Sequence, residues 1–379
     1  MRVAFGTTVL ANCLAHGGVD GIGAYTRELG GELSRRSDVA LIPAGFHATV
    51  PGGFFHGEAA PLDLGRYVPA AGISATTGMP FASQRVLAGQ VDLYHATDHL
   101  IPKFSSIPVV ATLMDAIPLS HPEWTRRHLA PLKRWLWRRS GHWADHVITI
   151  SEYSKREIIR HFGIAPEKIS VTPLGVDERY FTRMEATAVA EVLLRLQLPE
   201  RFFLFLGTLQ PRKNLGRTLD AHAALPAAMQ AEFPLVVVGR AGWESKALIA
   251  RLQDPGLART VRWLERRPDH DVRCLMQTAL ALVFPSLGEG FGLPMVEAFA
   301  AGLPVIASNT TSLPEVAAGA ALLVSPEDSG EICDAMRMLI EDSLLAETLV
   351  AGGLRRAREL SWKACAQATQ AAYSRVLSG

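Results

Sequence analysis

The sequence has few cysteines, and their spacing is not that of a metal site or a disulfide framework. The four cysteines, Cys13, Cys274, Cys333 and Cys365, are scattered over 379 residues without a CxxC pair or a Cys/His cluster. Zinc sites and disulfide-rich domains require cysteines in such patterns. The sequence therefore argues against both and is compatible with a reducing cytoplasm.

Long apolar runs are also absent. The first apolar segment, Val3–Phe5, ends at Gly6, which is too soon for the core of a signal peptide, and no later run approaches ~18 residues. We therefore expect a cytoplasmic protein that neither crosses a membrane nor is exported through a signal peptide.

An excess of one charge is lacking as well. The chain contains 38 Lys and Arg residues against 37 Asp and Glu residues, which gives a net charge of +1. This balance provides no general attraction to nucleic acid, so a charged ligand has to be recognised by a local group of residues. With 48% hydrophobic and 20% charged residues, the chain can bury two cores of ordinary size.

Short apolar or β-branched segments alternate with longer helical patterns throughout the chain. In the first half these segments are Val3–Phe5, Ala40–Ile42, Val91–Tyr94, Val109–Leu113 and His146–Ile150. In the second half they are Phe202–Leu206, Leu235–Val238, Val261–Leu264, Ala281–Phe284, Val305–Ala307 and Ala321–Val324. Such alternation predicts an α/β protein with two parallel sheets covered by helices.

A domain boundary is expected between Pro173 and Arg183, where a strand is followed by Pro-Leu-Gly-Val-Asp and a charged segment. The cleft between two such domains is the expected ligand site. Segment 44–72 is rich in Gly, Pro and Ala with little periodicity, so we expect it to be a loop.

The most informative segment lies between Phe284 and Ala317, where a strand is followed by a glycine-rich loop, a helix and another strand. Gly288, Gly290 and Gly292 allow backbone amides to approach a ligand, and the start of the next helix attracts an anion. Glu289 lies in the loop, and Glu297 lies about one turn into the helix. The pattern predicts a site for a ligand that carries both phosphate and hydroxyl groups.

These motifs resemble those of the retaining glycosyltransferases of family four. The resemblance covers nearly the whole chain, since matching segments occur in the expected order: Ile150–Lys155, Pro173–Asp177, Gly207–Asn214, Glu289–Glu297, Ala301–Ile306 and Pro314–Val316. It implies the GT-B fold, in which two Rossmann-like domains face a cleft and the last helix returns to the first domain. The implied domains are residues 1–176 on the acceptor side, residues 177–361 for the nucleotide sugar, and a terminal helix over 362–379.

The resemblance assigns the diphosphate of the donor to Lys213 and Arg212. Their positive charges would neutralise the leaving group as the bond to the sugar breaks. Many relatives carry an arginine directly after the glycine that corresponds to Gly207, whereas this chain has Thr208, which makes Arg212 the expected substitute. By the same resemblance Gly21 and Gly23, which open a helix near the N-terminus, lie beside the diphosphate.

Two glutamates are expected to recognise the rest of the donor. By resemblance Glu297 accepts hydrogen bonds from the ribose diol, and Glu289 faces the donor sugar. The amides of Phe291, Gly292 and Leu293 would hold phosphate oxygens. The simpler interpretations are a helix N-terminal glutamate and an ordinary loop charge.

The acceptor side is less well defined. Many relatives place a histidine where this chain has Met114, and the next residue, Asp115, is either a group facing the acceptor hydroxyl or a strand-end cap. His95, His99 and His121 are expected near the same place, although lone histidines are more often structural.

No metal or other cofactor is expected. Asp269-His270-Asp271 spells the Asp-x-Asp of metal-dependent glycosyltransferases of another fold, but it stands before a helical pattern, where helix capping is the better interpretation. The resemblance implies metal-independent transfer with retention, in which the leaving phosphate helps to deprotonate the acceptor.

A basic segment containing tryptophans lies between Trp124 and Trp143. Its cationic residues are Arg126, Arg127, Lys133, Arg134, Arg138 and Arg139. Such a helix binds anionic membrane surfaces, or else buries its tryptophans in the core. The first alternative implies a peripheral position at the inner face of the cytoplasmic membrane.

Together these patterns predict a hexosyltransferase of bacterial surface polysaccharide assembly, such as that of lipopolysaccharide O-antigen. GDP-mannose is the first expected donor and GDP-rhamnose the second, and the expected acceptor is a glycan or a lipid-linked oligosaccharide. The alternatives are a nucleotide-sugar epimerase of the same fold and a non-catalytic protein that binds sugar nucleotides or glycans.

Overall fold

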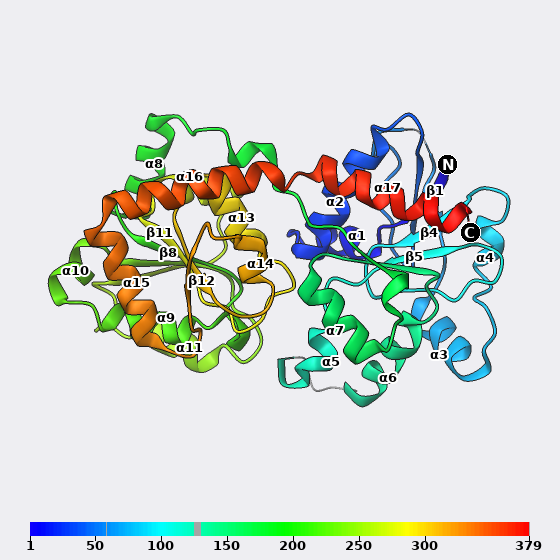
Figure 1. The fold of residues 1–379 in the computed structure, drawn as a ribbon, viewed down its shortest axis with the longest axis horizontal. Helices are drawn as coiled ribbons and strands as arrows, with labels where there is room; N and C mark the ends of the chain where they lie inside the picture. Colours follow the sequence, from blue (N-terminus) through cyan, green and yellow to red (C-terminus); the bar gives the residue numbers. More distant parts are fainter. Residues whose placement is uncertain (58, 125–129, 379) are drawn as a thin grey trace. The chain divides into compact units, whose positions relative to one another are not determined.

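The computed structural model describes residues 1–57, 59–124 and 130–378 (Figure 1). The chain divides into two compact units. Unit 1 contains Met1–Gly175 and Ser361–Gly379, and unit 2 contains Val176–Leu360. Each unit has one sheet of its own and one apolar core.

Unit 1 is built on a seven-stranded sheet with the order β3-β2-β1-β4-β5-β6-β7. All neighbouring strands are parallel, and β1, β4, β5 and β6 are almost entirely buried because helices cover both faces. The strands are β1 (Arg2–Gly6), β2 (Ala40–Gly45), β3 (Leu62–Asp63), β4 (Leu93–Ala96), β5 (Val109–Thr112), β6 (His146–Thr149) and β7 (Ile169–Val171).

The helices of unit 1 include the last helix of the chain, α17 (Trp362–Ser378), which packs on α2, β5 and β6. Tyr373 of α17 places its hydroxyl 2.6 Å from Nδ1 of the buried His95 in β4, which ties the end of the chain to this sheet. The other helices are α1 (Thr8–Ala15), α2 (Gly21–Ser34), α3 (Tyr67–Thr77), α4 (Gln84–Leu87), α5 (Ile117–Ser120), α6 (Ala130–Gly141) and α7 (Glu152–Phe162), with 3-10 turns η1 (Pro122–Trp124) and η2 (Pro166–Lys168).

Unit 2 contains a six-stranded parallel sheet with the order β10-β9-β8-β11-β12-β13. Its strands are β8 (Phe203–Leu206), β9 (Leu235–Val238), β10 (Val261–Leu264), β11 (Ala281–Phe284), β12 (Val305–Ser308) and β13 (Leu322–Val324). Its helices are α8 (Ala186–Leu196), α9 (Leu215–Ala223), α10 (Ala227–Glu232), α11 (Lys246–Leu252), α12 (Asp269–Thr278), α13 (Leu293–Ala300), α14 (Leu313–Ala317), α15 (Ser329–Glu341) and α16 (Ser343–Glu359), with 3-10 turns η3 (Glu178–Tyr180) and η4 (Pro211–Lys213).

The predicted α/β architecture with two parallel sheets is confirmed, and the differences are local. The interpretation of segment 44–72 as a loop is wrong in part, because β2 continues to Gly45, β3 pairs with it, and α3 begins at Tyr67. Tyr67 and Ala71 lie on the buried face of α3, and their packing stabilises this helix although its sequence does not separate clearly into an apolar and a polar face. The strand expected before Pro173 is β7, whereas the short edge strand β3 was not predicted, because two residues show no periodicity.

Both sheets reverse their order of assembly at one place. In unit 1 the chain runs from β1 to β2 and β3 on one side and places β4 to β7 on the other. In unit 2 it runs from β8 to β9 and β10 on one side and places β11 to β13 on the other. The carboxyl ends of the two strands at such a switch point diverge and leave room for a ligand. The switch points β1/β4 and β8/β11 are therefore the first places to search for a site.

The described part of the chain contains no helix with both the length and the apolar character needed to span a bilayer.

Candidate functional site

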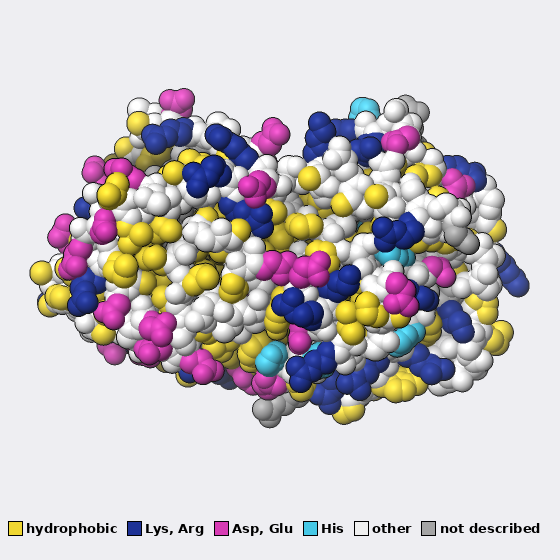
Figure 2. Space-filling model, viewed as in Figure 1, with side chains coloured by type: hydrophobic (Ala, Val, Ile, Leu, Met, Phe, Trp, Pro, Cys, Tyr) yellow, Lys and Arg dark blue, Asp and Glu magenta, His cyan; other side chains and the backbone are white. Residues whose placement is uncertain are grey.

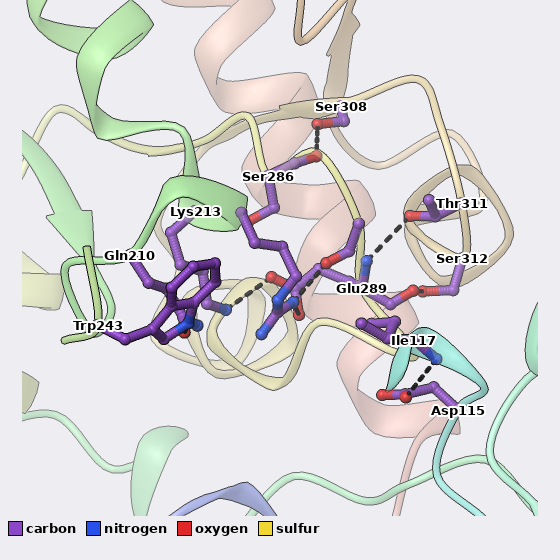
Figure 3. Close-up of polar contacts among 12 residues, drawn as sticks. Asp115, Ile117, Gln210, Lys213, Trp243, Ser286, Glu289, Ser308, Thr311 and Ser312 are labelled. Atoms are coloured by element: carbon purple, nitrogen blue, oxygen red, sulfur yellow. Dashed lines mark hydrogen bonds and ion pairs between the residues drawn. The ribbon is translucent and has the colours of Figure 1, made fainter. Parts of the chain in front are cut away.

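The β8/β11 switch point brings together the charged residues predicted from the two loops. Lys213 and Arg212 lie in η4 after β8, and Glu289 lies in the loop after the adjacent strand β11. Nζ of Lys213 is 2.6 Å from Oε1 of Glu289, and Nη1 of Arg212 is 2.9 Å from Oε2 (Figure 3). Two cations thus share one carboxylate, and this triad keeps a net positive charge.

The three charged side chains of the triad are largely buried, which strengthens the interactions between them. The side chains of Glu289, Lys213 and Arg212 are 9%, 12% and 19% exposed. Burial alone would raise the pKa of Glu289, but the charges and hydrogen bonds of Lys213 and Arg212 lower it to about 2. Burial also lowers the pKa of Lys213, and Glu289 opposes that shift. Glu289 and Lys213 therefore stabilise each other's ionised form.

Asn214 fixes the loop that carries the two cations. It adopts a left-handed conformation with a φ of 62°, and its side-chain amide donates to the carbonyls of Pro285 at 2.9 Å and Pro326 at 2.6 Å. These bonds tie the loop after β8 to the segments after β11 and β13. Asn214 was not predicted to have this role, although asparagine is one of the residues that adopt the left-handed conformation most readily.

Close backbone contacts also shape this end of the sheet. A Cβ at Gly239 would lie 1.9 Å from the carbonyl oxygen of Gly207, so position 239 requires glycine. Nζ of Lys213 lies 4.9 Å from the centre of the Phe284 ring, a cation–π contact beneath the loop. Trp243 donates from Nε1 to Gln210 at 3.1 Å and covers the start of η4 (Figure 3).

The loop after β11 is held by hydrogen bonds to the segment that precedes α14. The amide of Glu289 donates to Thr311 Oγ1 at 3.3 Å, and Ser312 Oγ donates to the Glu289 carbonyl at 2.9 Å (Figure 3). These bonds orient the backbone of Glu289 independently of its carboxylate. Neither residue was identified from the sequence.

The start of α13 has the geometry expected for an anion site. Gly292 is the N-cap residue with a φ of 100°, a conformation that favours glycine, and among the described residues no side chain caps this helix end. The predicted residues Phe291, Gly292 and Leu293 therefore lie where backbone amides meet the positive end of the helix dipole.

Glu297 lies in α13, half-buried, and belongs to a second polar group. The hydroxyl of Tyr180 in η3 lies within hydrogen-bonding reach of its carboxyl and donates to Asp269 Oδ1 at 3.4 Å. Arg179 lies 3.3 Å from Asp269 and 3.1 Å from Asp177. Burial and the charge of Asp269 raise the pKa of Glu297 to about 7, while Arg179 and Tyr180 oppose the shift. Glu297 therefore changes its ionisation near neutral pH.

The interpretation of Asp269-His270-Asp271 as a capping motif is wrong. The N-cap residue of α12 is Pro268, and none of the described side chains caps the helix with a hydrogen bond. Asp269 instead binds Arg179 and Tyr180, and Asp271 binds Arg195 at 2.8 Å, because cations of neighbouring elements compete with the helix amides. In the described parts of the chain, no group of three or more His, Cys, Asp or Glu residues is arranged to hold a metal ion.

The predicted residues of unit 1 lie near its own switch point. Gly21 and Gly23 begin α2, which follows α1 rather than the first strand directly, and the Gly23 amide already donates to Asp20 at 2.8 Å. Asp115 accepts a hydrogen bond from the amide of Ile117 at 2.9 Å, the interaction of a strand-end cap (Figure 3).

The three histidines of this unit differ. His95 is buried between Tyr373 and Thr112, and burial lowers its pKa to about 3, so its role is structural. His121 stacks on Trp124. His99 is exposed and meets the Trp137 ring edge-on at 5.7 Å.

The tryptophans of the basic segment differ in burial. Trp137 and Trp143 pack against the core, whereas Trp135 is 44% and Leu132 56% exposed. Lys133, Arg134, Arg138 and Arg139 lie on α6 at the exposed or half-buried positions, and Arg126 and Arg127 lie outside the described residues. Figure 2 shows Lys and Arg side chains gathered around this part of unit 1.

Comparison with known proteins gives a consistent result. The family model described as Glycosyltransferase Family 4 matches residues 19–180, and the model described as Glycosyl transferases group 1 matches residues 194–356. The chain is 36% identical over 231 residues to the O-antigen chain mannosyltransferase B of Escherichia coli, an alignment that covers 61% of this chain and 60% of that protein.

A second relative aligns over a longer region. The MMP alpha-(1->4)-mannosyltransferase of Mycolicibacterium hassiacum is 29% identical over 317 residues, which cover 78% of this chain and 74% of that protein. Among solved structures, sucrose-phosphate synthase from Thermosynechococcus elongatus has a TM-score of 0.78 at 20% identity, over 100% of this chain and 99% of that chain. This similarity establishes the fold.

Proposed function

We propose that this chain, which belongs to the glycosyltransferases that the group 1 and family 4 models describe, transfers mannose from GDP-mannose to a glycan acceptor. The two relatives described above are both mannosyltransferases by name, which supports mannose as the sugar and surface polysaccharide assembly as the setting. GDP-rhamnose is the second candidate donor. The observation that carries the proposal is the triad of Lys213, Arg212 and Glu289 at the β8/β11 switch point.

The triad suits a diphosphate because its two cations outnumber its one carboxylate. Phosphate oxygens would compete with Glu289 for Lys213 and Arg212, and charge-assisted hydrogen bonds to phosphate are strong in a buried site. The uncapped amides at the start of α13 add donors on the same side of the sheet. Binding of the diphosphate would free the Glu289 carboxylate to accept hydrogen bonds from the donor sugar.

Glu297 would bind the ribose of the nucleotide. A vicinal diol donates two hydrogen bonds, and an ionised carboxylate accepts both. The pKa of Glu297 is raised to about 7, so the ligand binds best when Glu297 is ionised. Nucleotide affinity is therefore expected to rise as the pH rises through 7.

The proposed reaction proceeds with retention and without a metal. The bond between the anomeric carbon and the phosphate oxygen breaks, and its electron pair stays with the diphosphate, which Lys213 and Arg212 stabilise. The acceptor hydroxyl forms the new bond on the same face of the sugar. Its proton passes to the departing phosphate, so that no covalent sugar–enzyme intermediate is required. Asp115 would contact the acceptor hydroxyl.

The proposal includes peripheral contact with an anionic membrane at the cytoplasmic face. The helices α3 and α6 pack side by side and expose large apolar side chains: Val68, Ile73, Leu132 and Trp135. Residues 64–91 and 124–144 contain no Asp or Glu, whereas Lys and Arg occur in both segments. Exposed apolar groups surrounded by cations favour an anionic lipid surface, where a lipid-linked acceptor would be found.

The function can be tested with purified protein, EDTA, and a panel of GDP-, UDP-, ADP- and dTDP-sugars together with extracted lipid-linked oligosaccharides. Released nucleotide and glycan mass are measured in the same samples. Release of GDP with a gain of one hexose supports the proposal, and a deoxyhexose gain identifies rhamnose. An isomerised sugar nucleotide without acceptor would indicate an epimerase, and no release from any donor would contradict transfer.

A further inference from the structure

A partly open cavity of about 110 Å³ lies in unit 1 at the carboxyl ends of β4 and β5, where β4 is one of the two strands of the switch point. Its walls come from segments that follow the carboxyl ends of β4 and β5, from the start of α2, and from α6 and α7. The residues that matter for its chemistry are Ile22, Asp98, Leu113, Met114, Trp137 and Phe162. The position is that of a ligand site in an open parallel sheet.

Most of the cavity wall is apolar and rigid. Trp137 is packed on the core of unit 1, and the His99 ring lies against it at 5.7 Å. Leu113 and Phe162 are buried behind the cavity, while Met114 and Ile22 are half-buried beside it. A preformed apolar wall of this kind binds a ligand that presents C–H groups.

Asp98 is the buried acid among the polar residues of the lining, which also include His99, Thr112, Asp115 and Ser140. The residue is 4% exposed, and Oδ1 accepts the amide hydrogen of Leu100 at 2.6 Å. Oδ2 has no hydrogen-bond partner among the residues that the structure describes, and the side chain lines the cavity. Burial raises the pKa of Asp98, with the neighbouring His99 opposing the shift. Asp98 Oδ2 is not among the fully buried side-chain atoms that lack a partner, so a ligand or water in the cavity can reach it.

We propose that this cavity binds one pyranose unit of the acceptor glycan, with a sugar hydroxyl on Asp98 Oδ2 and the C–H face of the ring against Trp137. A sugar matches both features, because its ring has an apolar face and its edge carries hydroxyls. A hydroxyl can donate to or accept from a carboxyl oxygen, so the match holds for either protonation state of Asp98. The inference rests on the proposed function, since it identifies where the acceptor of that reaction is recognised.

Methyl α-D-mannopyranoside is a suitable probe, with its affinity for the full chain measured by saturation-transfer NMR. Asp98→Ala should weaken binding at least about tenfold through the lost hydrogen bond. Asp63→Ala is the matched control, because Asp63 makes the same local turn, with Oδ1 accepting from the Gly65 amide at 2.9 Å, away from the cavity. The control should bind like the wild type.

Ile22→Trp provides a second variant in case Asp98→Ala does not fold. Ile22 is half-buried at the cavity, so the larger side chain should obstruct it, whereas Leu194→Trp on the exposed side of α8 in unit 2 should have no effect. Absence of binding to the wild type, or unchanged affinity in a folded Asp98→Ala or Ile22→Trp variant, would overturn the inference. GDP binding in the same samples separates the two proposals, because a protein that binds GDP but not the mannoside retains the proposed donor site.

Discussion

The two switch points have the same topology but opposite chemistry. At β8/β11 in unit 2, three buried charges form ion pairs at 2.6 and 2.9 Å, and a helix begins without a side-chain cap among the described residues. In unit 1, the cavity at the carboxyl ends of β4 and β5 has mainly apolar walls and contains the buried carboxyl of Asp98. The sheet thus supplies a place, and the loops after its strands decide which ligand fits.

Glu289 in unit 2 and Asp98 in unit 1 show how neighbouring charges change the pKa of a buried carboxyl group. Burial favours the neutral form of both Glu289 and Asp98. Two cations reverse this effect for Glu289 and lower its pKa to about 2, whereas the pKa of Asp98 stays raised. Glu289 therefore stays ionised, which suits a site whose cations bind phosphate. Asp98 is suited to a neutral hydroxyl ligand.

The largest effect is expected from removing a positive charge of the unit 2 site. Lys213→Ala should lower donor turnover by roughly 10²-fold or more, because one cation of the diphosphate site is lost. Nucleotide release is the measurement, and Lys246→Ala, an exposed lysine at the start of α11, is the control. Turnover close to that of the wild type would remove Lys213 from the diphosphate role.

A second change concerns the outer surface of unit 1. Arg138→Glu with Arg139→Glu should weaken binding to anionic vesicles by about tenfold or more, since each basic residue near the surface contributes ~1 kcal/mol. The hydrolysis of soluble donor should not change. The double variant Arg355→Glu and Arg358→Glu, on the exposed side of α16 in unit 2, is matched in charge. Equal loss of binding in both variants would refute a specific surface on α6.

A third prediction uses pH to separate Glu297 from the triad. The raised pKa of about 7 means that Glu297 gains a proton as the pH falls through 7, so GDP affinity should decrease several-fold from pH 8 to pH 6. Asp269→Asn removes the charge that helps to raise this pKa and should move the transition to lower pH. Calorimetric titration at several pH values measures both. A pH-independent affinity in this range would contradict the assignment of Glu297 to the ribose.

The smallest expected effect is at Asp115. Asp115→Asn preserves the oxygen that accepts from Ile117 but removes the charge, so kcat/KM for the acceptor should fall only a few-fold. Donor hydrolysis is measured in parallel and should remain unchanged. An unaffected transfer rate would leave Asp115 as a strand-end cap.

The sequence predicted the sheets well because buried parallel strands are continuous apolar runs, as in Leu235–Val238 and Ala281–Phe284. It also named the charged members of the unit 2 site. Geometry that depends on contacts distant in sequence was not predictable: Asn214 binds carbonyls 71 and 112 residues away. The same reason explains the error at Asp269, whose partner Tyr180 is 89 residues away.

Three residues of the cavity wall in unit 1, His99, Met114 and Asp115, were predicted to lie on the acceptor side, but the other residues of the proposed sugar site were not. Asp98 and Trp137 are isolated residues in unremarkable segments, and only the adjacency of β4, β5 and α6 makes them neighbours. The identity of Met114 indicated a departure from related sequences but not the apolar wall of which it is part.

The central proposal is that unit 2 binds the phosphates of the donor and unit 1 binds a hydroxyl group of the acceptor. Calorimetric titration of GDP into the wild type, Lys213→Ala and Asp98→Ala tests this division directly. The account predicts that Lys213→Ala binds GDP about tenfold or more weakly and that Asp98→Ala binds it like the wild type. Full GDP affinity in Lys213→Ala, or loss of GDP binding in a folded Asp98→Ala variant, would contradict it.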